Sequence, residues 1–243
     1  MSRRGALAVA LLLTTAPDAR AQVNLAWNKC LGLPGSADLA TYACDGSRHG
    51  QPFTLVASFV APAGVDSFYR AEVIIKIQTD RDFLQDWWHL GTGECRAGNL
   101  ALTAPSAFTS GAGCLSPWAG SLVAQQDLAS WESNYYTYPW DPSRGRSVTR
   151  TIRAFCTPLV AGQHYVATEL RFDNGADVGP GACTGCATPV TFWLAQVEID
   201  DAQPTGTVVH FLHDADVRDH VYWQGDYTPA RRTTWGAIKA TYR

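Results

Sequence analysis

The stretch that decides the fold is Glu72-Val-Ile-Ile-Lys-Ile-Gln78. Val73, Ile75 and Ile77 fall on one side of an extended chain, and the charged and amide side chains fall on the other. Successive side chains of a β-strand point to opposite faces, so this alternation indicates a strand with one buried face.

The same period of two recurs along the chain, and helical periodicity is almost absent. Further strands are predicted at 55–60, 148–156, 164–173, 191–200, 207–212 and 220–223. The inward residues expected in two of them are Val166, Thr168, Leu170 and Phe172, and Trp193, Ala195, Val197 and Ile199. In 148–156, Arg150 shares a face with Val148 and Ile152, so only the later part of that strand is expected to be buried.

Short strands separated by Gly, Pro, Asn and Asp turns are typical of a two-sheet antiparallel β-sandwich, jelly-roll or Ig-like. One short helix is predicted, with Ser116 as N-cap, Pro117 at the first helical position, and an end near Trp131. The sequence predicts one sandwich domain over 22–230 and a C-terminal tail over 231–243.

The N-terminus has the three parts of a signal peptide. Arg3 and Arg4 precede the apolar run Ala6–Leu13, and Ala19-Arg-Ala21 fits a cleavage site before Gln22. The arginine pair also allows a twin-arginine reading, which implies folding before export. Residues 1–21 are therefore predicted to be removed, which leaves a secreted or periplasmic protein.

Charge and hydropathy exclude two classes of partner. Lys and Arg number 19 against 22 Asp and Glu, a net charge of −3, and loss of the leader makes the chain more acidic. A nucleic-acid partner requires a basic face, and no basic cluster is present. No apolar run reaches the roughly 20 residues of a membrane-spanning helix, so neither nucleic acid nor a membrane span is expected.

The seven cysteines fit an oxidising compartment. Proximity in sequence predicts the pairs Cys30–Cys44, Cys95–Cys114 and Cys183–Cys186. Cys156 is left over, and we expect it to be a buried thiol, with an intermolecular bridge as the alternative. The Cys183-Thr-Gly-Cys186 turn lacks the βαβ setting of a redox site and a second ligand pair for zinc, so a structural disulfide is expected.

Several segments together resemble a family of exported, cysteine-paired β-sandwich proteins of environmental bacteria. They are Trp27–Cys30, Ala43–Asp45, Ser58–Gly64, Asp86–Trp88, Gly93–Arg96, Gly181–Cys186 and Trp235–Arg243. The resemblance implies an exported location and paired cysteines. It implies no activity, because none is known for that family.

Aromatic side chains are the first candidates for a binding site. Sugar rings pack their C–H faces on aromatic planes, and Tyr and Trp combine apolar area with a polar tip. The alternative is that these residues anchor loops to the core. The candidates are Trp87, Trp88, Trp131, Tyr135, Tyr136, Tyr138 and Trp140.

The densest polar cluster is the segment His210–His220. Asp214, Asp216 and Asp219 are candidate oxygen ligands for calcium, and the alternative is a solvated turn between strands. The EF-hand pattern is absent. No other cofactor is expected.

No catalytic motif is present: the chain lacks the serine elbow, the zinc-protease helix motif and a phosphate-binding glycine loop. The sequence therefore predicts a non-catalytic exported binding or structural module whose partner is a glycan or a surface protein. Two alternatives stay open: a secreted carbohydrate-active hydrolase with paired carboxylates from distant strands, and a component of an extracellular assembly.

Overall fold

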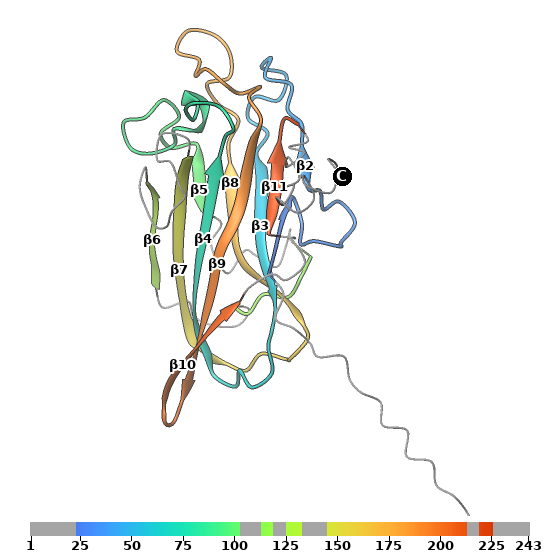
Figure 1. The fold of residues 1–243 in the computed structure, drawn as a ribbon, viewed down its shortest axis with the longest axis vertical. Coiled ribbons are helices and arrows are strands. Elements are labelled where there is room, and N and C mark those ends of the chain that lie inside the picture. Colours follow the sequence, from blue (N-terminus) through green and yellow to red (C-terminus); the bar gives the residue numbers. More distant parts are fainter. Residues whose placement is uncertain (1–22, 103–112, 119–124, 133–144, 213–218, 226–243) are drawn as a thin grey trace, which may run out of the picture.

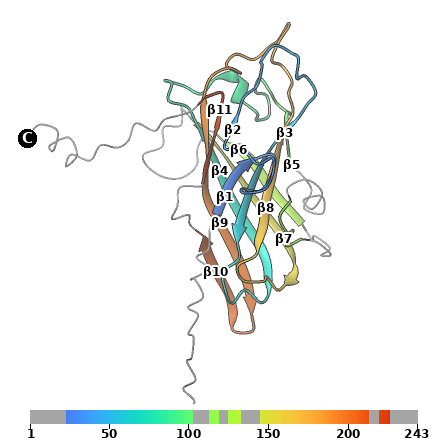
Figure 2. The same ribbon diagram turned by 90° about the vertical axis from the view of Figure 1, so that its right-hand side faces the viewer.

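Two β-sheets pack face to face in the computed structural model of the protein (Figures 1 and 2). The structure describes residues 23–102, 113–118, 125–132, 145–212 and 219–225, with the backbone alone at 125–132, 154–156 and 211–212. The predicted signal peptide and C-terminal tail lie outside these residues. The predicted all-β sandwich is confirmed.

The smaller sheet has four strands in the order β1-β3-β8-β5. All its pairs are antiparallel. Its strands are β1 (Val23–Trp27), β3 (Phe53–Val60), β8 (His164–Phe172) and β5 (Leu100–Leu102).

The larger sheet has seven strands, six of them in the order β2-β11-β9-β4-β7-β6. β10 pairs with β9 off this path, and their hairpin extends beyond the lower end of the sandwich in Figure 1. The β2–β11 pair is parallel. The strands are β2 (Leu39–Ala40), β11 (His220–Trp223), β9 (Val190–Gln203), β4 (Phe68–Gln78), β7 (Gly145–Thr157), β6 (Gln125–Glu132) and β10 (Gly206–Leu212).

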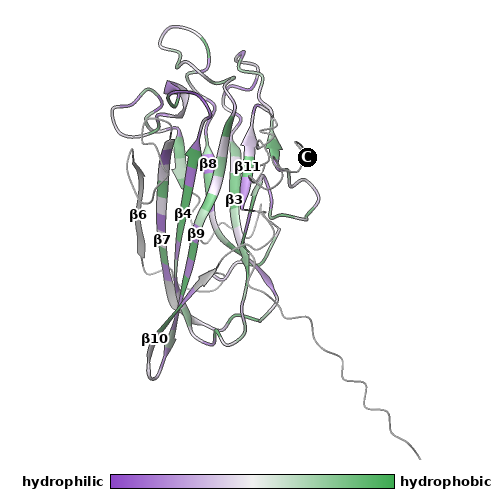
Figure 3. Cartoon of the chain, viewed as in Figure 1, coloured by the Kyte–Doolittle hydropathy of each residue, from purple (hydrophilic) through white to green (hydrophobic). Residues whose placement is uncertain are grey.

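The inner face of β4 is the one predicted from the alternation, since Val73, Ile75 and Ile77 are at most 2% exposed. The four residues expected inside in β8 are also buried, but the register against β3 shifts at Ala167, so Val166 does not share a face with Thr168, Leu170 and Phe172. Figure 3 shows the alternation of apolar and polar residues along β4. Such burial supplies most of the stabilising free energy of a sandwich, at about 25 cal/mol for each Å² of apolar surface.

Of the four residues predicted to face inward in β9, only Val197 and Ile199 do so. The register of β9 against β4 shifts where Ile74 pairs with Gln196 and Ile75 with Leu194, so Ala195 is an extra residue, a β-bulge. Phe192 and Leu194 are consequently buried on the same side as Val197 and Ile199. Trp193 and Ala195, which the sequence placed inside, lie on the outer face instead.

The predicted helix ending near Trp131 is wrong. Ser116 accepts a hydrogen bond from the Trp118 amide as an N-cap would, at 3.2 Å, but Pro117 and Trp118 form only a turn. The segment Gln125–Glu132 is the edge strand β6, paired with β7. Its backbone hydrogen bonds to β7 therefore override the local helix propensity of this segment.

Arg150 is inside the sandwich, contrary to the expectation that it would keep the start of its strand exposed. Val148, Arg150 and Ile152 are all buried, and Arg150 is 1% exposed. Its Nη1 donates to Thr168 Oγ1 at 2.8 Å and to the Glu169 carbonyl at 3.2 Å, across to the other sheet. Burial lowers the pKa of Arg150 to about 10, and the negative charge of Glu169, which acts to raise the pKa, offsets only part of this effect.

The predicted disulfide pairs are wrong. The bonds are Cys30–Cys114, Cys44–Cys186 and Cys95–Cys183, with sequence separations of 84, 142 and 88. Cysteines that are neighbours in sequence have different partners because each of their loops meets a segment that is distant in the chain. In the turn between Cys183 and Cys186, Gly185 has φ +97° and lies so close to Gln85 that any Cβ would clash.

The three disulfides indicate an oxidising extracellular or periplasmic location. Within the described ranges, no helix is long and apolar enough to cross a membrane. Whether Cys156 is buried stays a prediction, because its side chain is outside the described part of the chain.

Candidate binding face

Trp87 and Trp88 belong to the core and offer no surface to a ligand. Both are 0% exposed, and they follow one another in the 3₁₀ turn Asp86–Trp88. Their rings lie 4.6 Å apart edge to face, and both contact Trp223 of β11, at 5.1 and 5.3 Å. The alternative of loop anchoring is therefore correct for this pair.

The remaining aromatic candidates are not brought together by the described structure. Trp131 is in β6, opposite Val148 in the register of β7. Tyr135, Tyr136, Tyr138 and Trp140 lie outside the described residues. A binding surface in that segment stays a prediction.

The calcium site also stays a prediction, since Asp214 and Asp216 lie outside the described residues. Asp219 precedes β11: its carbonyl accepts from the Leu194 amide at 2.6 Å, and its carboxylate lies 3.1 Å from His220 Nδ1. In the described part of the chain, no group of three or more His, Cys, Asp or Glu side chains is arranged to hold a metal.

One loop end of the sandwich is held by polar contacts among distant segments. Arg96 is fully buried, lies 3.5 Å from the centroid of the Trp87 ring, and donates to the Trp87 and Asp173 carbonyls. Burial lowers its pKa to about 10. Tyr42 donates to Asp177 at 3.0 Å, so these side chains have a structural role in joining the loops.

The outer face of the larger sheet carries a site that the sequence did not predict. Trp193 of β9 pairs with Lys76 of β4 and with His220 of β11. In the next row, Thr191 pairs with Gln78 and with Tyr222. We call this surface the Trp193 face; its six residues are Lys76, Gln78, Thr191, Trp193, His220 and Tyr222.

Aromatic rings form one half of the Trp193 face. The Trp193 and His220 rings lie 5.1 Å apart at 33°, and His220 meets Tyr222 edge-on at 5.2 Å. His220 Nδ1 lies 3.1 Å from the Asp219 carboxylate, a contact that restrains the His220 ring. The three rings are half-buried, so each keeps part of its surface open to solvent.

A hollow of about 230 Å³ adjoins the Trp193 ring, between the end of β4 and the start of β9. Thr79 stabilises its wall: its hydroxyl contacts the Pro189 carbonyl at 3.4 Å and accepts from the Arg81 amide at 3.2 Å. The lining residues are Gln78, Thr79, Asp80, Pro189, Val190, Thr191 and Trp193. An apolar ring is thus combined with an amide, a carboxylate and hydroxyls.

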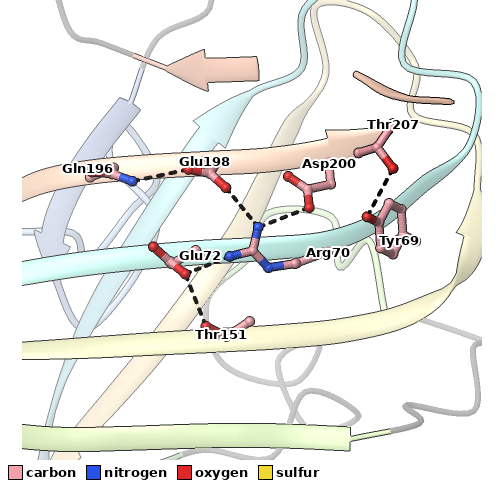
Figure 4. A network of polar contacts seen from close by, with 8 residues as sticks. All are labelled: Tyr69, Arg70, Glu72, Thr151, Gln196, Glu198, Asp200 and Thr207. Atoms are coloured by element: carbon pink, nitrogen blue, oxygen red, sulfur yellow. Dashed lines mark hydrogen bonds and ion pairs between the residues drawn. The ribbon is translucent and has the colours of Figure 1, made fainter. Parts of the chain in front are cut away.

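Further along the same outer face, Arg70 gathers three carboxylates (Figure 4). Its guanidinium donates to Glu72 at 2.6 Å, Glu198 at 2.7 Å and Asp200 at 2.9 Å. Burial would lower the pKa of Arg70, but these hydrogen bonds and charges outweigh it, and the net pKa is raised. The carboxylates are arranged to pair with a cation on an open sheet face, not to face each other across a cleft as an acid and a base would.

Sequence reasoning missed the Trp193 face because it assigned Trp193 to the core. The signal that identifies it is Phe192 and Leu194, two apolar residues that alternate with Trp193 and compete for the inward face. Choosing between the two sets requires the bulge at Ala195, which depends on pairing with β4.

No protein-family model matches the chain. No curated protein matches it either. Among solved structures, the chain is similar to a cohesin module from a family 33 glycoside hydrolase of Clostridium perfringens, with a TM-score of 0.30 and 7% identity over 80% of this chain and 95% of that module. At this TM-score the likeness carries no argument about function, which depends on the Trp193 face itself.

Proposed function

We propose that the protein is an exported, non-catalytic binding module that holds its ligand on the Trp193 face. The observation that carries the proposal is Trp193 itself, an indole on the outer side of a sheet beside a hollow with polar walls. A concave site with an apolar surface and a few polar groups that converge on it is typical of ligand binding.

The carboxylates of the outer face favour binding over hydrolysis. A glycosidase needs one carboxylic acid that protonates the leaving group and a second carboxylate placed across the sugar. Glu72, Glu198 and Asp200 instead share one arginine. Their oxygens accept hydrogen bonds from a guanidinium, which is an ion-pairing arrangement.

The test combines a binding and a turnover measurement. The indole signals of the nine tryptophans are recorded by NMR, with Trp193→Phe to assign one of them, while soluble polysaccharides and defined peptides are added. We expect at least one probe to shift the Trp193 signal and no probe to release reducing ends. Release of reducing ends that Glu198→Gln abolishes would overturn the non-catalytic assignment.

A second candidate, assembly through a strand edge, is favoured by β10. Val208 and Val209 are 43% and 42% exposed, and the strand Gly206–Leu212 has no lysine, acid or proline of the kind that protects edges. Sedimentation over a hundredfold concentration range tests it. A concentration-dependent dimer that Val208→Lys removes would support assembly, and a monomer throughout would reject self-association.

A further inference from the structure

The chemistry of the Trp193 face identifies a class of ligand. Resting on the proposed function, we infer that this ligand is a saccharide, with one sugar ring stacked on the Trp193 indole and its hydroxyls bound in the adjacent hollow. The argument uses the shape, the size and the hydrogen-bonding groups of the site.

The shape of the Trp193 face suits a ligand with a flat apolar surface and a polar edge. Trp193 is fixed in the middle of the sheet, between Lys76 and His220, so its orientation is set by two neighbouring strands. A pyranose ring presents C–H groups on its face and hydroxyls around its rim. Stacking therefore buries the apolar face on the indole and leaves the rim free to bond the polar side chains around it.

The size suits a single ring. The hollow of about 230 Å³ is smaller than the about 300–1,000 Å³ of pockets that enclose a drug-sized molecule. It borders Trp193 on one side and solvent on the other, along the open outer face of the sheet. One residue of a chain can therefore occupy the hollow while its neighbours extend over His220 and Tyr222.

The hydrogen-bonding groups suit hydroxyls. A sugar hydroxyl donates one hydrogen bond and accepts others, so it is best matched where donors and acceptors lie together. Gln78 supplies both, Asp80 accepts, and the Thr191 hydroxyl does either. The Trp193 Nε1 is buried and has no hydrogen-bond partner among the described residues, so the hydrogen bonds to the ligand come from these neighbours and not from the indole.

A protein partner fits this face less well. A standard interface buries about 800 Å² on each partner, with few charges in its core. A partner of that size centred on Trp193 would extend toward the Arg70 cluster, whose four charged groups would lose solvent. A saccharide covers the rings and the hollow without reaching those charges.

The experiment is calorimetric titration of the full chain with tetrasaccharides built from glucose, mannose, galactose, xylose or N-acetylglucosamine. We expect at least one to bind, Trp193→Ala to weaken it at least tenfold, and Trp193→Phe to retain part of the affinity because a ring remains. Thr191→Val, which keeps the shape and removes the hydroxyl, should weaken binding several-fold. Val209→Ala on β10 is the control, with unchanged affinity, and all variants are first compared by thermal unfolding.

Each other outcome counts against the inference. A panel in which no saccharide binds, or one that binds Trp193→Ala as well as the parent chain, overturns it. If a peptide shifts the Trp193 indole signal and no saccharide does, the saccharide inference fails and the proposed binding function stands. If neither class of probe reaches Trp193, both fail.

Discussion

Single side chains decide both the candidate site and the stability of the loop end of this protein. Trp193 shows how one residue on the outer face of a sheet turns an ordinary polar surface into a candidate site. Tyr42 shows a stabilising role, because its hydroxyl joins the loop after β2 to the loop after β8 through Asp177.

The Tyr42–Asp177 hydrogen bond should make stability depend on pH at both ends of the scale. Burial raises the pKa of Tyr42, and the hydrogen bond and charge of Asp177 raise it further. For Asp177, burial acts to raise the pKa, but the hydrogen bonds from Tyr42 and His49 outweigh it and the net pKa is lowered. The lowered carboxyl pKa stabilises the fold above about pH 4, and the raised phenol pKa stabilises it below about pH 10.

We therefore expect Tyr42→Phe to lower the free energy of unfolding near pH 7 by about 1.5 kcal/mol, since a hydrogen bond to a charged group is lost. The fall in stability below pH 4 and above pH 10 should also become shallower. Urea unfolding from pH 3 to 11 measures both effects. Tyr69→Phe is the matched control, because its hydroxyl makes one exposed contact with Thr207 at 3.4 Å, and an equal loss in the two variants would contradict the prediction.

At the scale of elements, β9 is the strand that organises the larger sheet. It pairs with β4 along most of its length, with β11 at its start and with β10 at its end. The bulge at Ala195 divides it into two parts that present opposite alternations. The first part places Trp193 outside, and the second places Glu198 outside to meet Arg70.

Deletion of Ala195 should therefore be far more damaging than substitution. A shift of one residue turns Val190, Phe192 and Leu194 toward solvent, because the side-chain period of a strand is two. We expect a loss of at least about 3 kcal/mol on deletion, and a change within about 0.5 kcal/mol for Ala195→Ser at this exposed position. Denaturant unfolding measures both, and a stable deletion variant would show that the register does not need the bulge.

Alternation predicts the inner face of β4 because buried and half-buried residues alternate along this strand. β3 and β8 are buried on both faces over most of their length, so alternation locates these strands but does not fix their inner face. β6 escaped prediction because an edge strand is fixed by pairing with its neighbour, not by a local pattern. The inward side of β9 escaped for the same reason, and with it the Trp193 face, since the bulge depends on pairing with β4.

At the scale of the whole molecule, the disulfides connect segments that sequence proximity cannot identify. The Cα atoms of each pair are 5.8–6.0 Å apart although the residues are at least 84 positions apart in the chain. Six of the seven cysteines are used, and both cysteines of the Cys183–Cys186 turn point to different, distant partners. The spacing of the cysteines can be read from the sequence, but which of their loops come together in the fold cannot.

Thiol titration of paired serine variants tests this connectivity. Cys44→Ser with Cys186→Ser removes one complete bond, whereas Cys44→Ser with Cys183→Ser leaves two partners without a cysteine. We expect the second variant to show two thiols more than the first after unfolding without reductant. The first should be less stable than the parent by about 3 kcal/mol, since a cross-link over a long loop restricts the unfolded chain. Equal thiol counts, with no new Cys95–Cys186 bond found by peptide mapping of the second variant, would contradict the assignment.

The interleaving of the three bonds has a consequence for how the protein is made. A chain that enters an oxidising compartment N-terminus first brings Cys30 and Cys44 together long before Cys114 and Cys186 follow. If Cys30 and Cys44 are oxidised as soon as both have been exported, they form a non-native disulfide with each other. Thiol–disulfide exchange is then needed to replace it with the native bonds. We therefore expect the yield of natively paired protein to depend more on a disulfide isomerase, which exchanges wrong pairs for native ones, than on the supply of an oxidant.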